Sequence, residues 1–223
     1  MTKLKEFSNL LRKKKELIGC IFMTLLVQFI ITALTIRVDQ THHYLGKDYS
    51  FFKSFAIFFA GVFMIVTMIG HNKLSFMMRQ LIFISFSILM GLLLSQTINY
   101  INDPDIIHSA LLATIINSVA LLMLGLIIVY FKYDLEWMGS LFFIALLLVI
   151  TSRIIVSFSK KSTDYNKKIS IISVFLFSLY ILYDTNNILL KYKDNNKIDC
   201  IRGSLDYYLD ILNLFTSCLN IKN

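Results

Sequence analysis

The chain of 223 residues has 57% hydrophobic and only 16% charged residues, and its mean hydropathy is +0.68. Soluble domains carry about 25% charged residues, so this composition argues against a soluble globular enzyme. The single proline and eight glycines argue against a β-sandwich, whose many turns use these residues. The formal net charge of +8 comes from basic residues between apolar runs, which indicates a lipid bilayer with anionic headgroups as the partner and no nucleic acid.

Six apolar stretches are each long enough to cross a bilayer as a helix, since one crossing needs roughly 20 residues. They run over 17–38, 51–70, 80–98, 106–131, 137–157 and 169–190. A seventh stretch, 204–219, is interrupted by acidic residues, so it must be shielded from lipid or enter the membrane without crossing it. The sequence therefore predicts an all-α, polytopic membrane protein. It is expected to be a seven-helix bundle of six spans and a weaker C-terminal helix.

The distribution of Lys and Arg sets the expected boundaries and orientation. Residues 1–16 form a basic tail, whereas the 39–50 loop is nearly free of basic residues. The positive-inside rule therefore predicts a cytosolic N-terminus. The lysine-rich loop 158–168 disagrees, because alternation of the spans puts it on the far side. We expect a single transmembrane bundle over 17–219 and a short tail over 220–223.

The cysteines carry little information by themselves. Cys20, Cys200 and Cys218 are odd in number and lack CxxC spacing, so we expect no disulfide framework and no metal site from them. The basic N-terminus lacks a small-residue cleavage signature, so the first apolar run is expected to stay as a signal anchor.

Polar residues inside the apolar segments are informative, because a charge near the bilayer centre costs at least ~2.5–3.5 kcal/mol. The seventh stretch carries polar residues at helical spacing on one face: Asp206, Asp210, Asn213 and Ser217. The sixth span carries a second such face: Ser173, Tyr180, Asp184, Asn187 and Lys191. Because a short loop joins these helices, we expect the two polar faces to meet.

If Asp184 and Asp210 meet there, both carboxylates are not easily ionised, because like charges repel strongly in a low dielectric. The pair is then expected to share a proton that holds the two helices together. Loss of the proton leaves a repulsion that parts the helices or attracts a cation. Carboxylate and amide oxygens are the ligands that calcium prefers, so Asp184, Asp206 and Asp210 are candidates for both a gate and a calcium site.

Several other polar residues keep two readings open. Arg153 is either a snorkelling residue at a helix end or the ion-pair partner of a carboxylate. Milder polar faces on the first and fourth spans either hydrogen-bond helices together or line a narrow polar path; they comprise Thr24, Gln28, Thr32, Thr35, Thr114 and Asn117. The aspartates, too, could serve only to hold helices together, although burying a carboxylate in a membrane costs much free energy for that purpose.

Two stretches strongly resemble a known C-terminal signature. Residues 177–188, FSLYILYDTNNI, and 204–215, SLDYYLDILNLF, are similar to the signature of the transmembrane Bax inhibitor motif family, which includes Bax inhibitor, the Golgi anti-apoptotic proteins and bacterial homologues. The resemblance implies a seven-helix bundle in which Asp184 pairs with Asp210, and Asp206 matches an additional acidic position of some eukaryotic members. It also implies a pH-sensitive calcium leak, lowered calcium stores and suppression of cell death.

The sequence also departs from the family pattern. Family members often carry an acidic residue in the third span, whereas the corresponding residues 86–91 of this chain are mostly apolar. Members also often carry a basic residue at the end of helix two, where this chain has His71-Asn72-Lys73. The resemblance implies a multi-pass protein of the endoplasmic reticulum or Golgi in a eukaryotic or viral source, and of the plasma membrane in a bacterial one.

Three function classes follow. The favoured one is a non-enzymatic, pH-sensitive calcium leak that suppresses apoptosis and uses no cofactor beyond passing calcium ions and protons. The second is a non-conducting adaptor that docks to membrane proteins of the apoptosis or calcium-store machinery. The third is an intramembrane aspartyl protease of presenilin type, but its GxGD motif is replaced here by Tyr207-Tyr208-Leu209-Asp210, and Pro104 is the only proline.

Overall fold

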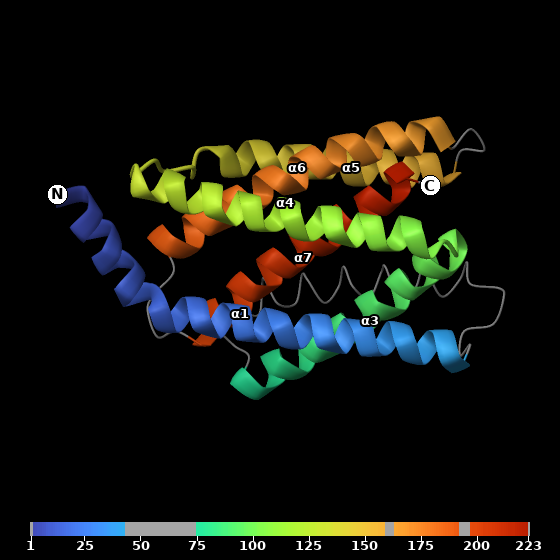
Figure 1. The fold of residues 1–223 in the computed structure, drawn as a ribbon, viewed down its shortest axis with the longest axis horizontal. Helices are drawn as coiled ribbons and strands as arrows, with labels where there is room; N and C mark the ends of the chain where they lie inside the picture. The colour runs from blue at the N-terminus through green and yellow to red at the C-terminus, as the bar shows by residue number, and fades with distance from the viewer. Residues whose placement is uncertain (1, 43–74, 159–162, 192–196, 223) are drawn as a thin grey trace. The chain divides into compact units, whose positions relative to one another are not determined.

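The computed structural model of the chain describes residues 2–42, 75–158, 163–191 and 197–222 (Figure 1). These residues form six helices: α1 (Thr2–His42), α3 (Phe76–Ile101), α4 (Pro104–Tyr130), α5 (Met138–Phe158), α6 (Thr163–Leu190) and α7 (Lys197–Lys222). The predicted all-α class is confirmed for this part of the chain. The predicted span 51–70 and the residues His71-Asn72-Lys73 lie outside the described residues.

Four helices are long and apolar enough to cross a bilayer, which confirms a polytopic membrane protein. The apolar spans are Leu4–Thr41, Met77–Ile101, Pro104–Tyr130 and Asp164–Leu190. In α5 the apolar stretch is shorter, Met138–Arg153. Large apolar side chains such as Ile116, 61% exposed, and Leu148, 65% exposed, point away from protein, as expected of side chains that face lipid.

The chain forms two compact units. Residues 1–16, 103–195 and 205–223 make up the first unit, and residues 17–102 and 196–204 make up the second. The basic segment 2–16 is already helical, because α1 begins at Thr2. The single bundle expected over 17–219 stays a prediction.

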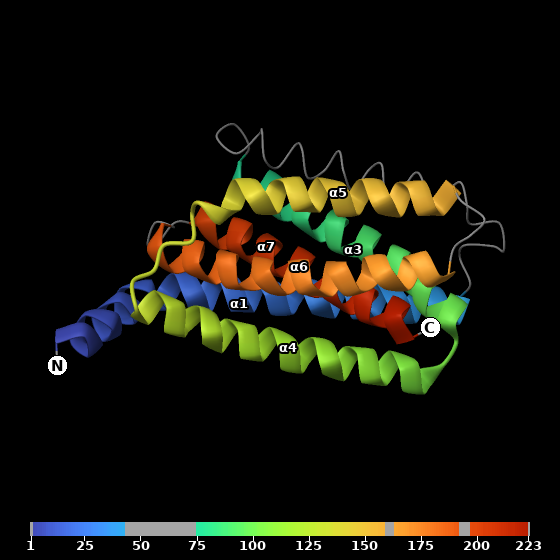
Figure 2. The same cartoon turned by 90° about the horizontal axis from the view of Figure 1, so that it is seen from above.

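In the first unit, α6 packs against both α4 and α5 and lies between them (Figure 2). Phe142 and Val149 of α5 form a buried apolar cluster with Leu176 of α6. The backbones of α4 and α6 approach closely at Gly125, where an added Cβ would lie 2.8 Å from Cβ of Thr185. Small residues at helix contacts allow this kind of close packing in membranes.

Asn186 secures the connection between α4 and α5. Its side chain is fully buried, donates from Nδ2 to the carbonyl of Tyr133 (2.8 Å) and accepts the backbone N–H of Leu135 at Oδ1 (3.2 Å). Lys191, at the end of α6, forms an ion pair with Glu136 (2.8 Å) in the same connection. One end of α6 is thereby fixed to the connection that precedes α5.

In the second unit, α1 and α3 run parallel. Thr32 Oγ1 donates to the Ser87 carbonyl (3.4 Å), and further along both helices Ser95 Oγ donates to Asp39 Oδ2 (2.7 Å). Gly91 lies between these two contacts on α3.

A short turn around Pro104 separates α3 from α4. Asn102 ends α3 in the left-handed region, with φ of 46°, which asparagine tolerates better than most residues. Asp103 caps α4 by accepting the backbone N–H groups of Asp105 (3.0 Å) and Ile106 (3.3 Å). Pro104 occupies the first helical turn, where its missing N–H leaves no hydrogen bond unmade.

Candidate functional site

Two of the predicted aspartates meet between α6 and α7. Asp210 is buried, with 5% of its surface exposed, and its side chain lies within hydrogen-bond reach of the Asp184 side chain. Asp206, one turn earlier on α7, is close enough to act electrostatically on Asp210. Ionised carboxylates only accept hydrogen bonds, so a bond between two carboxyl groups requires that one of them holds a proton. The geometry therefore fits a shared proton.

Tyrosines close the site on the α6 and α7 sides. Tyr207 is buried and its phenol donates to Thr185 Oγ1 (2.9 Å), which in turn donates to the Ile181 carbonyl (2.6 Å). Tyr180 lies within electrostatic range of Asp184 and Asp210, and its ring packs on Phe142 with centroids 5.3 Å apart. The carboxyl pair is thus bordered by aromatic rings.

Arg153 ties three helices together through hydroxyl groups. Its Nη2 donates to Ser173 Oγ of α6 (3.1 Å) and to Ser217 Oγ of α7 (2.9 Å). It forms no ion pair with any carboxylate in the described part of the chain. The structure therefore does not show Arg153 as the ion-pair partner of a carboxylate.

The two predicted supporting asparagines do not join the helices. Asn213 Nδ2 donates to the Leu209 carbonyl of its own helix (2.8 Å). Asn187 Oδ1 has no hydrogen-bond partner among the described residues, and the same holds for Oδ2 of Asp210.

The calcium ligand set expected from the three aspartates is not tested by the structure. No group of three or more His, Cys, Asp or Glu side chains is placed to hold a metal ion in the ranges that the structure covers. Asp184, Asp206 and Asp210 as calcium ligands therefore stay a prediction.

The milder polar faces on α1 and α4 each contain hydrogen bonds between helices and hydrogen bonds within one helix. Asn117 Nδ2 donates to Ser178 Oγ (2.7 Å) and so joins α4 to α6, as the adhesion reading expects. The hydroxyls of Thr24, Thr35 and Thr114 instead donate to carbonyls four residues earlier in their own helices. Back-bonded hydroxyls of this kind add little between helices.

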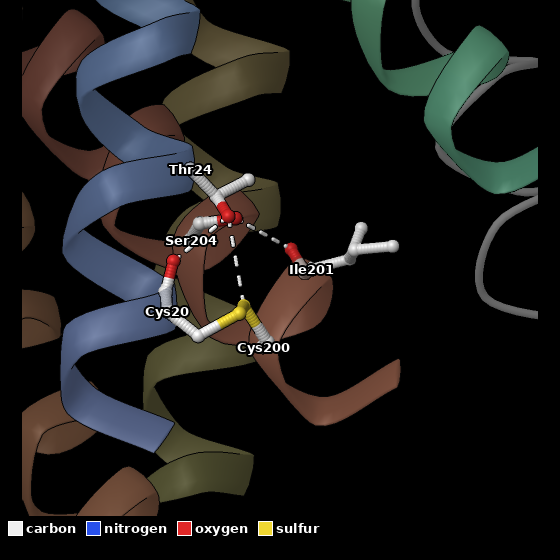
Figure 3. The surroundings of a disulfide bond; sticks show 5 residues. All are labelled: Cys20, Thr24, Cys200, Ile201 and Ser204. Atoms are coloured by element: carbon white, nitrogen blue, oxygen red, sulfur yellow. Dashed lines mark hydrogen bonds between the residues drawn. A yellow bond between two sulfur atoms is a disulfide. The ribbon is translucent and has the colours of Figure 1, made fainter. Parts of the chain in front are cut away.

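The expectation that the cysteines form no disulfide is wrong. Cys20 of α1 and Cys200 of α7 are bonded, with their Cα atoms 5.8 Å apart and 180 positions apart in sequence (Figure 3). Thr24 Oγ1 lies 3.5 Å from Cys200 Sγ, one turn along α1. Spacing rules detect only cysteines that are near one another in sequence, and here the fold brings two distant ones together. Cys218 is free.

Some site residues were not found from the sequence. Thr185 and Tyr207 adjoin the aspartates in sequence, but nothing in the pattern predicted their mutual hydrogen bond. Asp39 is 2% exposed, and it was missed because the predicted first span ends at residue 38 whereas α1 continues to His42.

Residues 14–223 match the family described as "Inhibitor of apoptosis-promoting Bax1". The chain belongs to the Bax inhibitor family. The resemblance seen at the aspartates is therefore confirmed across most of the chain. Proteins of the Bax inhibitor family are generally non-enzymatic membrane proteins.

The relatives of this Bax inhibitor family member include bacterial and animal proteins. An uncharacterized protein of Campylobacter jejuni is 40% identical over 90 residues, which are 40% of this chain and 37% of the relative. An uncharacterized membrane protein of Vibrio cholerae is 34% identical over 140 residues, or 61% of this chain and 59% of the relative. Bax inhibitor 1 of Drosophila melanogaster is 29% identical over 142 residues, or 61% of this chain and 55% of the relative. The chain thus spans less than two thirds of the length of each of these relatives.

Proposed function

We propose that the chain is a pH-sensitive calcium-leak protein that is gated by the Asp184–Asp210 pair. The observation that carries this proposal is that two carboxyl groups, one of them on a buried residue of α7, lie within reach of a mutual hydrogen bond. That bond exists only while a proton is present, so the contact between α6 and α7 depends on proton activity.

Removal of the proton replaces a hydrogen bond by a repulsion. Two unit charges about 4 Å apart repel by about 4 kcal/mol at an effective dielectric constant of about 20. A change of this size shifts a two-state equilibrium by about a thousandfold. Asp206 adds further negative charge, so the opened pair attracts a cation such as calcium.

The cellular consequences are part of the same proposal. In a eukaryotic or virus-infected cell, a leak through the endoplasmic reticulum or Golgi membrane lowers stored calcium and suppresses apoptosis. The name of the fly relative, Bax inhibitor 1, supports this reading. In a bacterium the same leak acts at the plasma membrane. The N-terminus faces the cytosol in either case, because of its basic residues.

Calcium efflux from proteoliposomes, measured as a function of pH, tests the gate. The leak of the unmodified protein is expected to rise with pH as the shared proton is lost. In Asp210→Asn the amide donates to the Asp184 carboxylate without titrating, so the leak is expected to stay low at every pH. Asp164→Asn is the matched control, because the side chain of Asp164 is 77% exposed. Equal leaks of the unmodified protein and Asp210→Asn at all pH values would sink the proposal.

A non-conducting adaptor is the second candidate, and the composition of α3 favours it. This helix, Phe76–Ile101, carries no acidic residue, although family members often have one there. An adaptor works by docking to membrane proteins of the apoptosis or calcium-store machinery. It predicts that protection from cell death survives in the Asp184→Asn/Asp210→Asn double variant, whereas the leak hypothesis predicts that the double variant loses its pH response.

A further inference from the structure

The contact between α1 and α3 contains a row of buried polar side chains. Gln28, Thr32 and Asp39 of α1, and Ser87 and Ser95 of α3, are each at most 3% exposed. Both helices are long and apolar enough to cross a bilayer, so these groups have no lipid-side partner. Their hydrogen bonds must therefore come from protein, from water or from a bound ion.

The hydroxyls in the row are satisfied, whereas the amide of Gln28 and one carboxylate oxygen of Asp39 have no hydrogen-bond partner among the described residues. Ser87 Oγ donates to Phe83 O (3.0 Å), and Ser95 Oγ donates to Asp39 Oδ2 (2.7 Å). Asp39 Oδ1 is buried and has no hydrogen-bond partner among the described residues. An unpaired buried polar atom costs about 1–3 kcal/mol, and more when it is charged. No Lys or Arg of the described ranges forms an ion pair with Asp39.

Contacts between α1 and α3 flank Asp39 on both sides along the helices. One turn before Asp39, an added Cβ on Gly91 would lie 2.7 Å from Thr35 Cβ and 3.0 Å from the Thr32 carbonyl, so the backbones of α1 and α3 nearly touch there. On the other side of Asp39, Gln40 Nε2 donates to Asn99 Oδ1 (3.3 Å), and both side chains are exposed. This exposed amide pair adjoins the contact between Asp39 and Ser95, because Gln40 follows Asp39 on α1 and Asn99 lies one turn beyond Ser95 on α3.

We propose that Asp39 and its neighbours at the ends of α1 and α3 form a second, low-affinity calcium site, separate from the Asp184–Asp210 pair. The carboxylate is held in place by the Ser95 hydroxyl, which leaves Oδ1 available to the ion. The amide oxygens of Gln40, the next residue of α1, and of Asn99, one turn beyond Ser95 on α3, supply further hard ligands in this proposal. Water completes the shell, since calcium takes 6–8 oxygens. One carboxylate with water-rich coordination matches sites with dissociation constants of about 10⁻⁴–10⁻³ M. With a cytosolic N-terminus, this site faces the lumen or the exterior.

Calcium binding to the full-length protein in nanodiscs tests the site, with radioactive calcium as the probe. The parent is the Asp184→Asn/Asp210→Asn variant, so that failure of the proposed gate and failure of this site give different results. Binding is expected to persist in the parent and to disappear when Asp39→Asn is added. Ser95→Ala is expected to weaken binding by about 10–100-fold, because it removes the group that orients the ligand.

Two further measurements keep the outcome clear. Asp105→Asn, at an exposed position in the first turn of α4, is the matched control and is expected to bind calcium like the parent. If Asp39→Asn does not fold, the thermal unfolding of Ser95→Ala with and without calcium replaces it, and a reduced calcium-induced shift supports the site. Unchanged binding in Asp39→Asn, or no binding in the parent, overturns the proposal.

Discussion

The bond between Cys20 and Cys200 gives a quantitative prediction about stability. It joins residues 180 positions apart, and for a loop of that length the chain-entropy relation gives about 5 kcal/mol at 25 °C. That figure refers to a fully unfolded chain. Helices that stay inserted in a membrane restrict the unfolded state already, so the expected contribution is nearer the typical 2–4 kcal/mol.

The perturbation is Cys20→Ser in purified protein, compared with the unmodified protein before and after treatment with a reductant. The substitution and the reduction are expected to lower the unfolding temperature by the same amount, since each removes the Cys20–Cys200 disulfide. The unreduced protein is expected to run faster than the reduced one on a denaturing gel, because the bond closes a large loop. Cys218→Ser is the matched control, and the free thiol of Cys218 predicts no effect.

The result that would refute this reasoning is full alkylation of both Cys20 and Cys200 in protein exposed to an oxidant. The same experiment in cells also tests the orientation. A cytosolic N-terminus puts both cysteines near the cytosolic face, where thiols are kept reduced, so the bond is expected only after oxidative treatment. A bond that forms without treatment would favour the opposite orientation.

Two further substitutions test the packing of the first unit. Gly125→Ala is expected to destabilise the protein by about 1–3 kcal/mol in thermal unfolding, because the new Cβ meets Thr185 at 2.8 Å. Gly19→Ala, whose Cβ would meet nothing within 4 Å, is the control and is expected to be neutral or slightly stabilising. Asn186→Ala is expected to lower the free energy of unfolding by about 1–3 kcal/mol for each backbone group that it leaves unpaired. Asn187→Ala is the control and is expected to cost little, because it removes an oxygen without a described partner. Equal losses in the two variants would contradict the role given to Asn186.

The helices were predictable because the bilayer imposes a simple rule. A chain in lipid must satisfy its backbone hydrogen bonds internally, so each long apolar run becomes a helix. The rule says less about where a helix ends. The predicted 17–38 span became a helix from Thr2 to His42, because backbone hydrogen bonds continue past the apolar side chains. Asp39 was missed for this reason.

The partners of polar groups were harder to predict than their positions. The spacing of Asp206 and Asp210 correctly assigned them to one helix, α7. In its described residues this helix has no stretch long and apolar enough to be a membrane-span candidate. By contrast, no pattern of one helix shows that Arg153 bonds to Ser173 and Ser217, since these partners come from two other helices. Contacts of this kind depend on how each helix is rotated about its own axis. A polar face in the sequence fixes that rotation only to within about one side-chain position.

Asp210 and Asp39 are both buried, but their hydrogen bonds have different requirements. This difference allows the effect of protons on the gate to be separated from the binding of a cation at Asp39. The bond between Asp210 and Asp184 joins two acceptors and so needs a proton from solution. The bond to Asp39 carries its own hydrogen from Ser95, so it persists when the carboxylate is ionised. Raising the pH therefore breaks the first bond and leaves the second intact. Calcium binding at Asp39 is accordingly expected to remain at the high pH values at which the gate between α6 and α7 opens.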